Sequence, residues 1–336
     1  MTLGRQQQSS HHTHPQVTMK VIITGASGVL GSAIYSEFQR DSFFEIKGLS
    51  HSSARDDLTK INLLDAHATE NVIASFKPDW VIHCAAERRP DVASQNPELA
   101  QKLNAEVPKT LADLSYKYNF ILVYISTDYV FDGTSPPYEV DATPNPVNFY
   151  GKTKREGEIA ILKTQNGVSK GQRVVLRVPV LYGPSPRNSD TAINILVDIV
   201  QDQSGKTYKM DHFATRFPTN TIDIASFLHR LILDKPQDPL SNAPTGSTRN
   251  LPSIIHYSAA EPFTKYEICL IFSKILGLPN GHIVPDAEEP TGEAAVSRPK
   301  NCMLSTRVIE DVLQMDVGAG LFEEWWSTYL NAAKSG

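Results

Sequence analysis

Tyr150 and Lys154, four residues apart in the chain, are the side chains best suited to proton transfer. On a helix this spacing places both side chains on one face. A phenol has an ordinary pKa of about 10 and is a poor acid–base catalyst near neutrality, but an adjacent ammonium stabilises its phenolate. Thr127, at the end of an apolar run, supplies a hydroxyl that could hydrogen-bond a carbonyl beside Tyr150. The three residues predict an acid–base group for carbonyl chemistry.

Three glycines, Gly25, Gly28 and Gly31, stand three residues apart in the segment MKVIITGASGVLG. A pyrophosphate can approach a backbone turn closely only where no Cβ intervenes, and a helix that follows the turn presents free N–H groups to it. Gly25 and Gly28 would allow this approach, and Gly31 would allow close packing of helix on strand. The glycines alone are also compatible with a plain tight turn. A β-branched run before them and helical apolar spacing after them favour a dinucleotide site.

The end of the second expected strand predicts which dinucleotide fits. A free ribose 2′-hydroxyl is usually held by an acidic residue about 20 positions after the glycines. This chain has SHSSAR at residues 50–55, so Ser50 and Arg55 favour a 2′-phosphate, and therefore NADP over NAD, with NAD still possible. Arg55 could instead be a solvated loop charge. Asp65 is expected to meet the adenine edge of the cofactor, and a surface acid without a ligand is the alternative for it. The residues expected to contact the cofactor are Gly25, Ser27, Gly28, Val29, Leu30, Gly31, Ser50, Arg55, Leu64, Asp65, Ala85, Ala86, Tyr150 and Lys154.

The elements that must position these residues alternate along the chain. Short apolar runs typical of strands occur at 19–24, 44–50, 79–86, 120–126 and 174–183, and segments with helical spacing lie between them. Near-continuous apolar strands alternating with helices predict an α/β fold with a doubly wound parallel sheet of the Rossmann type. Beyond Gly183 the rhythm breaks, with helices expected at 192–201 and 264–277. A strand at 253–259 could return to the main sheet.

These patterns predict three parts of unequal size. Residues 1–18 are expected to be a disordered tail. Residues 19–185 are expected to form an NADP-binding Rossmann domain, with return segments at about 216–233 and 250–260. Residues 186–330 are expected to form a smaller, discontinuous and interleaved lobe that resembles a substrate-binding lobe.

Composition excludes several classes of protein. The 336 residues include 32 Lys and Arg against 37 Asp and Glu, so no basic field favours nucleic acid as a partner. No apolar run approaches the ~20 residues of a membrane helix. Three cysteines without a C-x-x-C pair predict neither a disulfide framework nor a metal site. A cytoplasmic location is therefore expected.

The glycine turn, combined with Thr127, Tyr150 and Lys154, resembles the extended short-chain dehydrogenase/reductases. The segments ISTDYVFDG, NFYGKTKREGE, RFPTNTIDIA and SRPKNCMLST look like the dTDP-4-dehydrorhamnose reductase branch of that family. Within the branch, HCAAERRPDV, DYVFDGTSPPY, MDHFATRFPT and FTKYE are most similar to the regulatory β subunits of methionine adenosyltransferase.

This resemblance implies an NADP-binding protein that forms a hetero-oligomer with a methionine adenosyltransferase catalytic subunit and modulates S-adenosylmethionine synthesis. The alternative is an active NADPH-dependent oxidoreductase of the dTDP-4-dehydrorhamnose reductase type, acting on a 4-keto nucleotide sugar with Tyr150 as proton donor. The sequence leaves open whether the chain is an enzyme, because a site can keep catalytic residues while its substrate pocket changes.

Candidate substrate-pocket residues lie in two segments. Arg88 and Arg89 follow the strand VIHCAA and could hold phosphate oxygens, with a surface salt bridge to Glu87 or Asp91 as the alternative. His212 and Arg216 could line the pocket from the smaller lobe, although a lone histidine is more often structural. Near the end of the chain, Trp325 and Trp326 are expected to pack a terminal helix.

Overall fold

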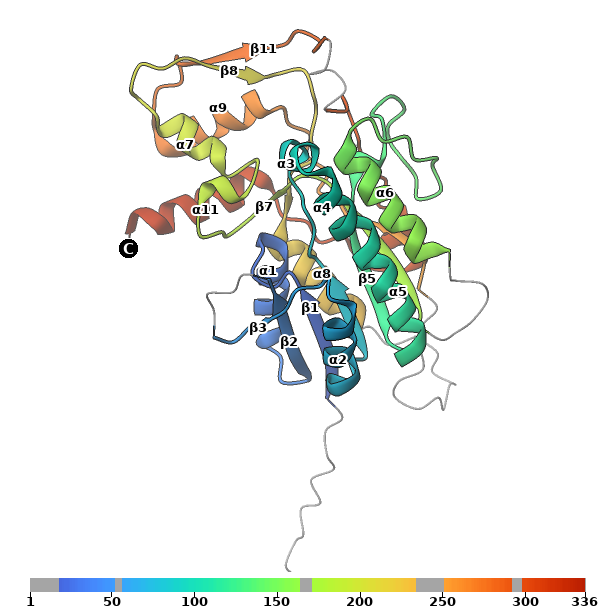
Figure 1. Ribbon diagram of the computed structural model, residues 1–336. Coiled ribbons are helices and arrows are strands. Elements are labelled where there is room, and N and C mark those ends of the chain that lie inside the picture. The colour runs from blue at the N-terminus through green and yellow to red at the C-terminus, as the bar shows by residue number, and fades with distance from the viewer. Residues whose placement is uncertain (1–17, 52–55, 164–170, 234–250, 292–297, 336) are drawn as a thin grey trace, which may run out of the picture.

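The computed structural model describes residues 18–51, 56–163, 171–233, 251–291 and 298–335, so Arg55 and nearly all of the expected tail lie outside the described residues. Seven parallel strands form the main sheet in the order β10-β6-β5-β4-β1-β2-β3 (Figure 1). Their bounds are β1 (Met19–Thr24), β2 (Phe44–Ser50), β3 (Thr59–Lys60), β4 (Trp80–His83), β5 (Ile121–Thr127), β6 (Arg173–Val178) and β10 (Ile254–His256).

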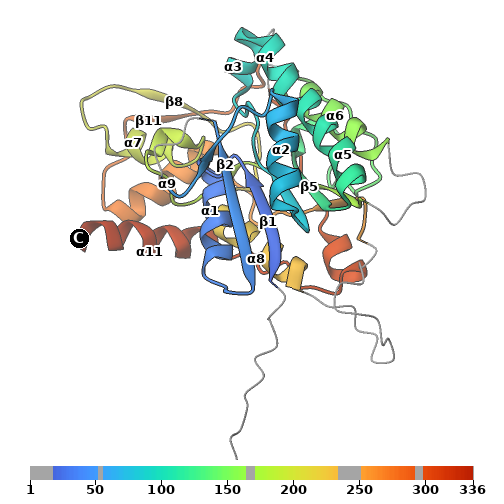
Figure 2. The ribbon, with the colours of Figure 1, turned by 60° about the horizontal axis from the view of Figure 1, so that its bottom comes forward.

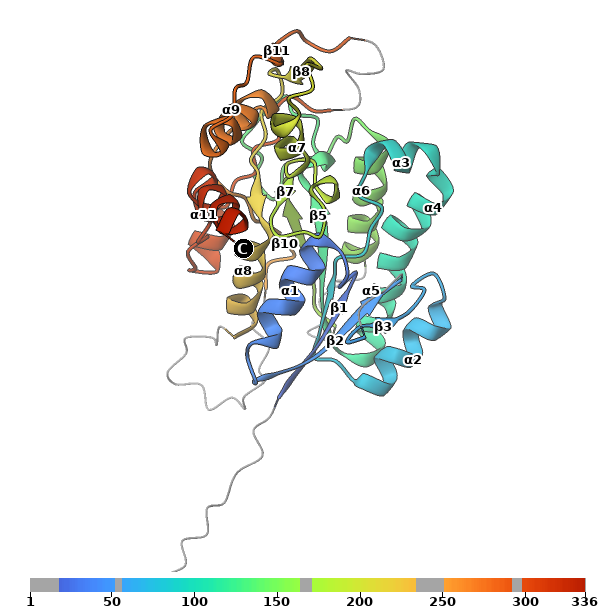
Figure 3. The same ribbon diagram turned by 90° about the vertical axis from the view of Figure 1, so that its left-hand side faces the viewer.

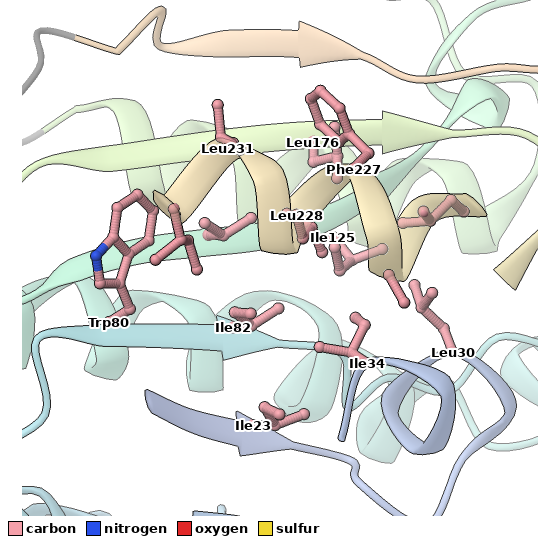
Figure 4. Close-up of a cluster of buried hydrophobic side chains, with 14 of the residues drawn as sticks. Ile23, Leu30, Ile34, Trp80, Ile82, Ile125, Leu176, Phe227, Leu228 and Leu231 are labelled. Atoms are coloured by element: carbon pink, nitrogen blue, oxygen red, sulfur yellow. The ribbon is translucent and has the colours of Figure 1, made fainter. Parts of the chain in front are cut away.

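Helices cover both faces of this sheet (Figures 2 and 3). One face carries α1 (Val29–Gln39) and α8 (Thr221–Leu233), and the other carries α2 (Ala66–Phe76), α5 (Val107–Tyr118) and α6 (Phe149–Leu162). Figure 4 shows the core of the first face, where strand residues meet α1 and α8; it includes Ile23, Ile82, Ile125, Leu30, Ile34, Phe227 and Leu228. The doubly wound α/β prediction is confirmed.

Burial on both faces explains why the strands were recognisable. All four residues of β4 and all six of β6 are buried. A strand covered on one face alternates apolar and polar side chains, whereas a strand covered on both faces is apolar throughout. The runs WVIH and VVL are therefore direct signatures of a central parallel strand.

A smaller lobe lies beyond the carboxyl ends of the strands (Figure 1). It contains the helices α7 (Ile195–Gln201), α9 (Lys265–Leu276) and α11 (Phe322–Ser335). Two parallel strand pairs accompany them: β8 (Tyr208–Asp211) with β11 (Ile283–Asp286), and β7 (Leu181–Tyr182) with β9 (Thr219–Asn220). Its core is rich in aromatic side chains, among them Tyr182, Phe272, Phe322 and Trp326. Trp326 is fully buried, as expected for a packed terminal helix.

The chain passes between the two lobes more than once. After β9 it re-enters the main sheet region as α8, which packs on the same core as α1, and then as β10, which extends the sheet beside β6. The segment 299–305 also returns, because Ser305 N donates to Tyr138 O and Tyr138 N donates to Met303 O. The predicted interleaving is thus confirmed. Within the described residues, no helix combines the length and apolarity needed to cross a membrane.

The helical region between β4 and β5 contains an irregular turn. It begins as α4 (Pro97–Gln101), after the short α3 (Pro90–Gln95), passes through a π-helical turn at Lys102–Glu106 and continues as α5. A π turn inserts one extra residue into a helix and is frequent near functional sites. Other short helical turns occupy Asp128–Val130, Asn188–Asp190 and Val308–Val312.

Candidate functional site

A cavity of about 1170 Å³ lies at the carboxyl ends of the central strands and is lined by residues of both lobes. This edge is where doubly wound sheets bind their ligands. Of the predicted cofactor and catalytic residues, the lining includes Gly25, Ser27, Gly28, Val29, Leu30, Gly31, Ser50, Leu64, Ala85, Ala86, Thr127, Tyr150 and Lys154. Asp65 and His212 do not line it.

The glycine turn forms a cradle that side chains would fill. Gly25 has φ +65°, and a Cβ there would lie 2.8 Å from Ala85 N. A Cβ on Gly31 would lie 2.1 Å from Gly25 O, so the first turn of α1 packs directly on the loop. Gly28 is the N-cap of α1 and has no side chain to satisfy the first helical N–H groups. These features fit the pyrophosphate of a dinucleotide.

The end of β2 presents a hydroxyl instead of an acid. Ser50 is buried, and its Oγ donates to Ser27 Oγ at 3.1 Å. Leu64 lines the cavity as well. Asn62 and Leu63 also line it, and the sequence interpretation missed these two residues. Asp65 instead caps α2, because its carboxylate accepts a hydrogen bond from Ala68 N at 2.9 Å. Aspartate is a favoured N-cap residue, and this local role accounts for its position.

The structure brings Thr127, Tyr150 and Lys154 together. Thr127 ends β5, and its side chain lines the same cavity as Tyr150 and Lys154. Lys154 is buried; its Nζ donates to Ile125 O at 2.7 Å. Burial lowers the pKa of Lys154 to about 7, although Glu158 opposes this shift. Burial likewise raises the pKa of the Tyr150 phenol above its ordinary value.

Two residues fix the start of α6 and so the position of Tyr150. Asn148 is the N-cap, and its side chain accepts a hydrogen bond from Gly151 N at 2.7 Å. A Cβ on Gly151 would lie only 2.2 Å from Tyr129 O, so only glycine lets α6 approach the turn after β5 this closely. The close approach sets Tyr150 beside Thr127.

A buried ionic network on the next turn of α6 supports the site formed by Thr127, Tyr150 and Lys154. Glu158 is fully buried and accepts hydrogen bonds from Ser126 Oγ at 2.7 Å and from Arg177 Nε at 2.8 Å. Arg155 adds a further bond at 2.9 Å. These donors hold the pKa of Glu158 below its ordinary value despite burial. The network ties α6 to β5 and β6 and places a fixed negative charge near Lys154.

Asp128, which follows Thr127, is a cavity residue that the sequence interpretation passed over. Its side chain is 8% exposed, and Thr127 Oγ donates to its carboxylate at 3.0 Å. Burial raises the pKa of Asp128 to about 7, and Arg216 acts in the opposite direction. An ionisable group of this kind in a cleft is characteristic of functional sites. The only sequence signal for it was its position directly after a strand end.

Cationic side chains also line the cavity. Arg88, Arg89 and Arg216 line it as predicted, and Lys265 and Arg298 join them. Burial and the charges of Arg216 and Arg298 lower the pKa of Lys265 to about 8. This arrangement would favour an anionic ligand.

The remaining residue predicted for the pocket, His212, has a structural role. Its Nδ1 hydrogen-bonds Thr264 Oγ1 at 2.9 Å, and its ring contacts Tyr266. Within the described residues, no cluster of His, Cys, Asp and Glu is arranged to hold a metal ion.

The loop that carries Arg88 and Arg89 is anchored to the π turn. Asn104, fully buried in that turn, accepts a hydrogen bond from Glu87 N and donates to Glu87 O, both at 2.9 Å. It also donates to Thr153 Oγ1 on α6 at 3.0 Å. Arg89 Nε also lies 3.9 Å from Glu87 Oε1. Arg89 therefore lines the cavity and, at the same time, forms the salt bridge that was its alternative role.

Comparison with known proteins adds three findings. Residues 19–320 match the family model described as RmlD substrate binding domain. The methionine adenosyltransferase 2 subunit beta of Xenopus tropicalis is 43% identical over 293 residues, which span 87% of this chain and 82% of that protein. Among solved structures, a dTDP-4-dehydrorhamnose reductase from Bacillus anthracis in complex with NADP superposes with a TM-score of 0.74 at 23% identity, covering 91% of this chain and 96% of that one.

A dTDP-4-dehydrorhamnose reductase of Clostridium acetobutylicum gives a TM-score of 0.75 at 24% identity and covers 94% of this chain and 100% of that one. At these identities the two crystal structures support the fold alone. The Xenopus relative is similar enough in sequence, over enough of both chains, to define the family.

Proposed function

Because this chain belongs to the RmlD substrate binding domain family and, within it, to the methionine adenosyltransferase 2 beta subunits, we propose that it is an NADP-binding regulatory subunit of methionine adenosyltransferase. It would bind a catalytic subunit as a hetero-oligomer and modulate S-adenosylmethionine synthesis. The observation that carries this proposal is the 43% identity over 293 residues to a beta subunit. A cytoplasmic location is part of the proposal, and three free cysteines are consistent with it.

NADP is the proposed cofactor, with NAD as the less favoured ligand. The cradle at Gly25 and Gly31 and the free N-terminus of α1 support a dinucleotide in general. Ser50, in place of an acid at the end of β2, supports the 2′-phosphate. In this proposal residues 19–185 and the return segments at about 216–233 and 250–260 form the NADP-binding part. Residues 186–330 supply the smaller lobe.

The dinucleotide would act chiefly as a structural ligand. A ligand that binds only the folded state stabilises it by mass action, by ~2.7 kcal/mol at 100 times its Kd. Because both lobes line the cavity, a ligand held there would also stabilise their mutual arrangement. The docking surface for a catalytic subunit could thus depend on NADP without any hydride transfer.

Size-exclusion chromatography of the chain mixed with a methionine adenosyltransferase catalytic subunit tests this function. We expect co-elution, strengthened by NADP, and altered synthetase kinetics. Tyr150→Phe should leave the complex intact, whereas Gly28→Val, whose Cβ would already lie 3.2 Å from Gly25 O, should weaken both NADP binding and docking. Gly281→Val is the matched control, because a Cβ there meets no atom within 4 Å. Separate peaks under all conditions, with unchanged kinetics, would overturn the regulatory role.

An active reductase is the second candidate, because Thr127, Tyr150 and Lys154 stand together in the cavity. In this role Tyr150 would donate a proton to the carbonyl oxygen of a 4-keto nucleotide sugar, and NADPH would supply the hydride. General acid catalysis contributes roughly 10²–10⁴-fold. Tyr150→Phe should therefore abolish measurable NADPH consumption with a dTDP-4-dehydro-6-deoxy sugar while cofactor binding survives. Equal rates in the two proteins would exclude a catalytic role for Tyr150.

A further inference from the structure

The ammonium of Lys154 lies over the aromatic ring of Tyr124. Its Nζ is 4.0 Å from the centroid of that ring and donates a hydrogen bond to Ile125 O at 2.7 Å. Both side chains are buried, and that of Tyr124 is not exposed at all. The negative face of an aromatic ring attracts a cation, and the attraction is stronger where water is excluded. The ring of Tyr124 is therefore an uncharged group that favours the charged form of Lys154.

Three neighbouring elements hold the ring of Tyr124 in this place. Its phenol donates to Asn104 O in the π turn at 3.0 Å, and also to Lys154 O on α6 at 3.3 Å. His83 on the adjacent strand β4 stacks on the ring, with 5.9 Å between centroids and an interplanar angle of 19°. A Cβ on Gly157 would lie 2.3 Å from the phenol oxygen, so glycine lets α6 pack directly against Tyr124. These contacts fix the ring beside the ammonium.

The titratable groups around Lys154 do not by themselves balance the cost of its burial. Glu158 raises the pKa of Lys154, but its carboxylate is shared with the Arg177 guanidinium at 2.8 Å. His83 and Cys84 are uncharged near neutral pH, because burial lowers the pKa of His83 to about 3 and raises that of Cys84 to about 12. Burial still lowers the pKa of Lys154 to about 7. At this value, a modest further interaction decides how much of the amine is charged.

We propose that Tyr124 is a positioning residue, whose ring face keeps the Lys154 ammonium charged and in place at the wall of the cavity. Tyr124 does not itself line the cavity, so it acts on a ligand only through Lys154. Tyr150, the other titratable group of the site, stays neutral near neutral pH because burial raises its pKa. The inference rests on the proposed NADP-binding function, in which Lys154 contacts the cofactor.

Fluorination of the ring at position 124 tests this role with little change of shape. Each fluorine withdraws electron density from the ring face and weakens its attraction for a cation. The pKa of Lys154 is followed by the carbon-13 shift of lysine Cε, with the signal assigned by its loss in Lys154→Met. Tyr124→Phe, which keeps the ring face, should leave this pKa nearly unchanged. Tyr124→Phe with one, two and three ring fluorines should lower it stepwise, by roughly half a unit to one and a half units in total.

Phe120 provides the matched control, because it is buried in the same core as Tyr124. In the described part of the chain, its ring makes no cation–π contact with Lys154. Three fluorines on Phe120 should therefore leave the pKa of Lys154 unchanged. A pKa that stays constant across the Tyr124 series would overturn the inference. So would an equal shift on fluorination of Phe120, because fluorine in the core would then act without any contact to the ammonium.

The pH dependence of NADP binding separates this inference from the proposed cofactor. A fall of about one unit in the pKa of Lys154 reduces its charged fraction near neutral pH from about a half to about a tenth. The trifluorinated protein should therefore bind NADP roughly fivefold more weakly near neutral pH, and the two affinities should agree within about 1.5-fold at about pH 5.5. An equal loss at both pH values would indicate a structural defect and overturn the inference. A chain that binds no NADP excludes the proposed cofactor, and the carbon-13 titration alone then decides whether Tyr124 sustains the charge of Lys154.

Discussion

Replacing Ser50 by aspartate should reverse the dinucleotide preference of the cavity. Ser50 is buried at the end of β2, 3.1 Å from the Ser27 hydroxyl at the glycine turn. A carboxylate there would face the ribose 2′ substituent. A 2′-phosphate carries roughly two negative charges, and each would be repelled by ~1 kcal/mol at about 4 Å even with the dielectric constant of water. The total of ~2 kcal/mol is roughly a 30-fold loss of NADP affinity.

Isothermal titration calorimetry with NADP and NAD measures both sides of this change. The carboxylate could accept a hydrogen bond from the free 2′-hydroxyl of NAD, so NAD affinity should hold or rise. Ser50→Asn is the matched control, since it adds nearly the same bulk without charge. If the aspartate and asparagine variants bind NADP with equal affinity, the 2′-phosphate does not lie at the end of β2 and the reasoning fails.

Three further outcomes are expected. The pKa of Lys154 is about 7, and the phosphate groups of NADP favour its charged form. NADP affinity should therefore weaken as the pH rises above 7, by at most ~10-fold per pH unit. In calorimetric titrations, Lys154→Met should make NADP affinity nearly independent of pH in this range. Glu158→Ala leaves the Arg177 guanidinium buried without its carboxylate, so it should lower the free energy of unfolding by about 3–5 kcal/mol. Urea-induced unfolding measures this loss, and a loss below ~1 kcal/mol would contradict the expectation. Gly31→Ala places a Cβ 2.1 Å from a backbone oxygen and should lower both Tm and NADP affinity, whereas Gly281→Ala should change neither in a thermal-shift assay.

The main sheet could be predicted because its strands carry a local signal. The centres of β1, β4 and β6 read VII, WVI and VVL, and such unbroken apolar runs are typical of strands covered on both faces. The pairs of the smaller lobe carry no such signal. In β11, Val284 is 39% exposed and Pro285 interrupts the pattern, and its partner β8 lies far away in sequence.

The site was predictable where its chemistry depends on spacing along one element. Tyr150 and Lys154 share α6, and the glycines share one turn. Asp128 and Lys265 were missed because their roles depend on which side chains other segments bring near, and no pattern within their own segments shows it. Asp65 shows how a local role can explain a predicted residue, because its carboxylate caps its own helix.

The late return of β10 to the edge of β6 has a consequence for synthesis on the ribosome. When β6 leaves the exit tunnel, neither α8 nor β10 has been made, so the β6 edge and the apolar surface that α8 covers beside α1 stay uncovered. Unpaired strand edges and exposed apolar surface make such nascent chains prone to aggregate. The chain must therefore be extended past His256 before the sheet closes. The edge of β6 therefore stays unpaired for longer than in a protein whose nucleotide-binding half is complete before the second half begins.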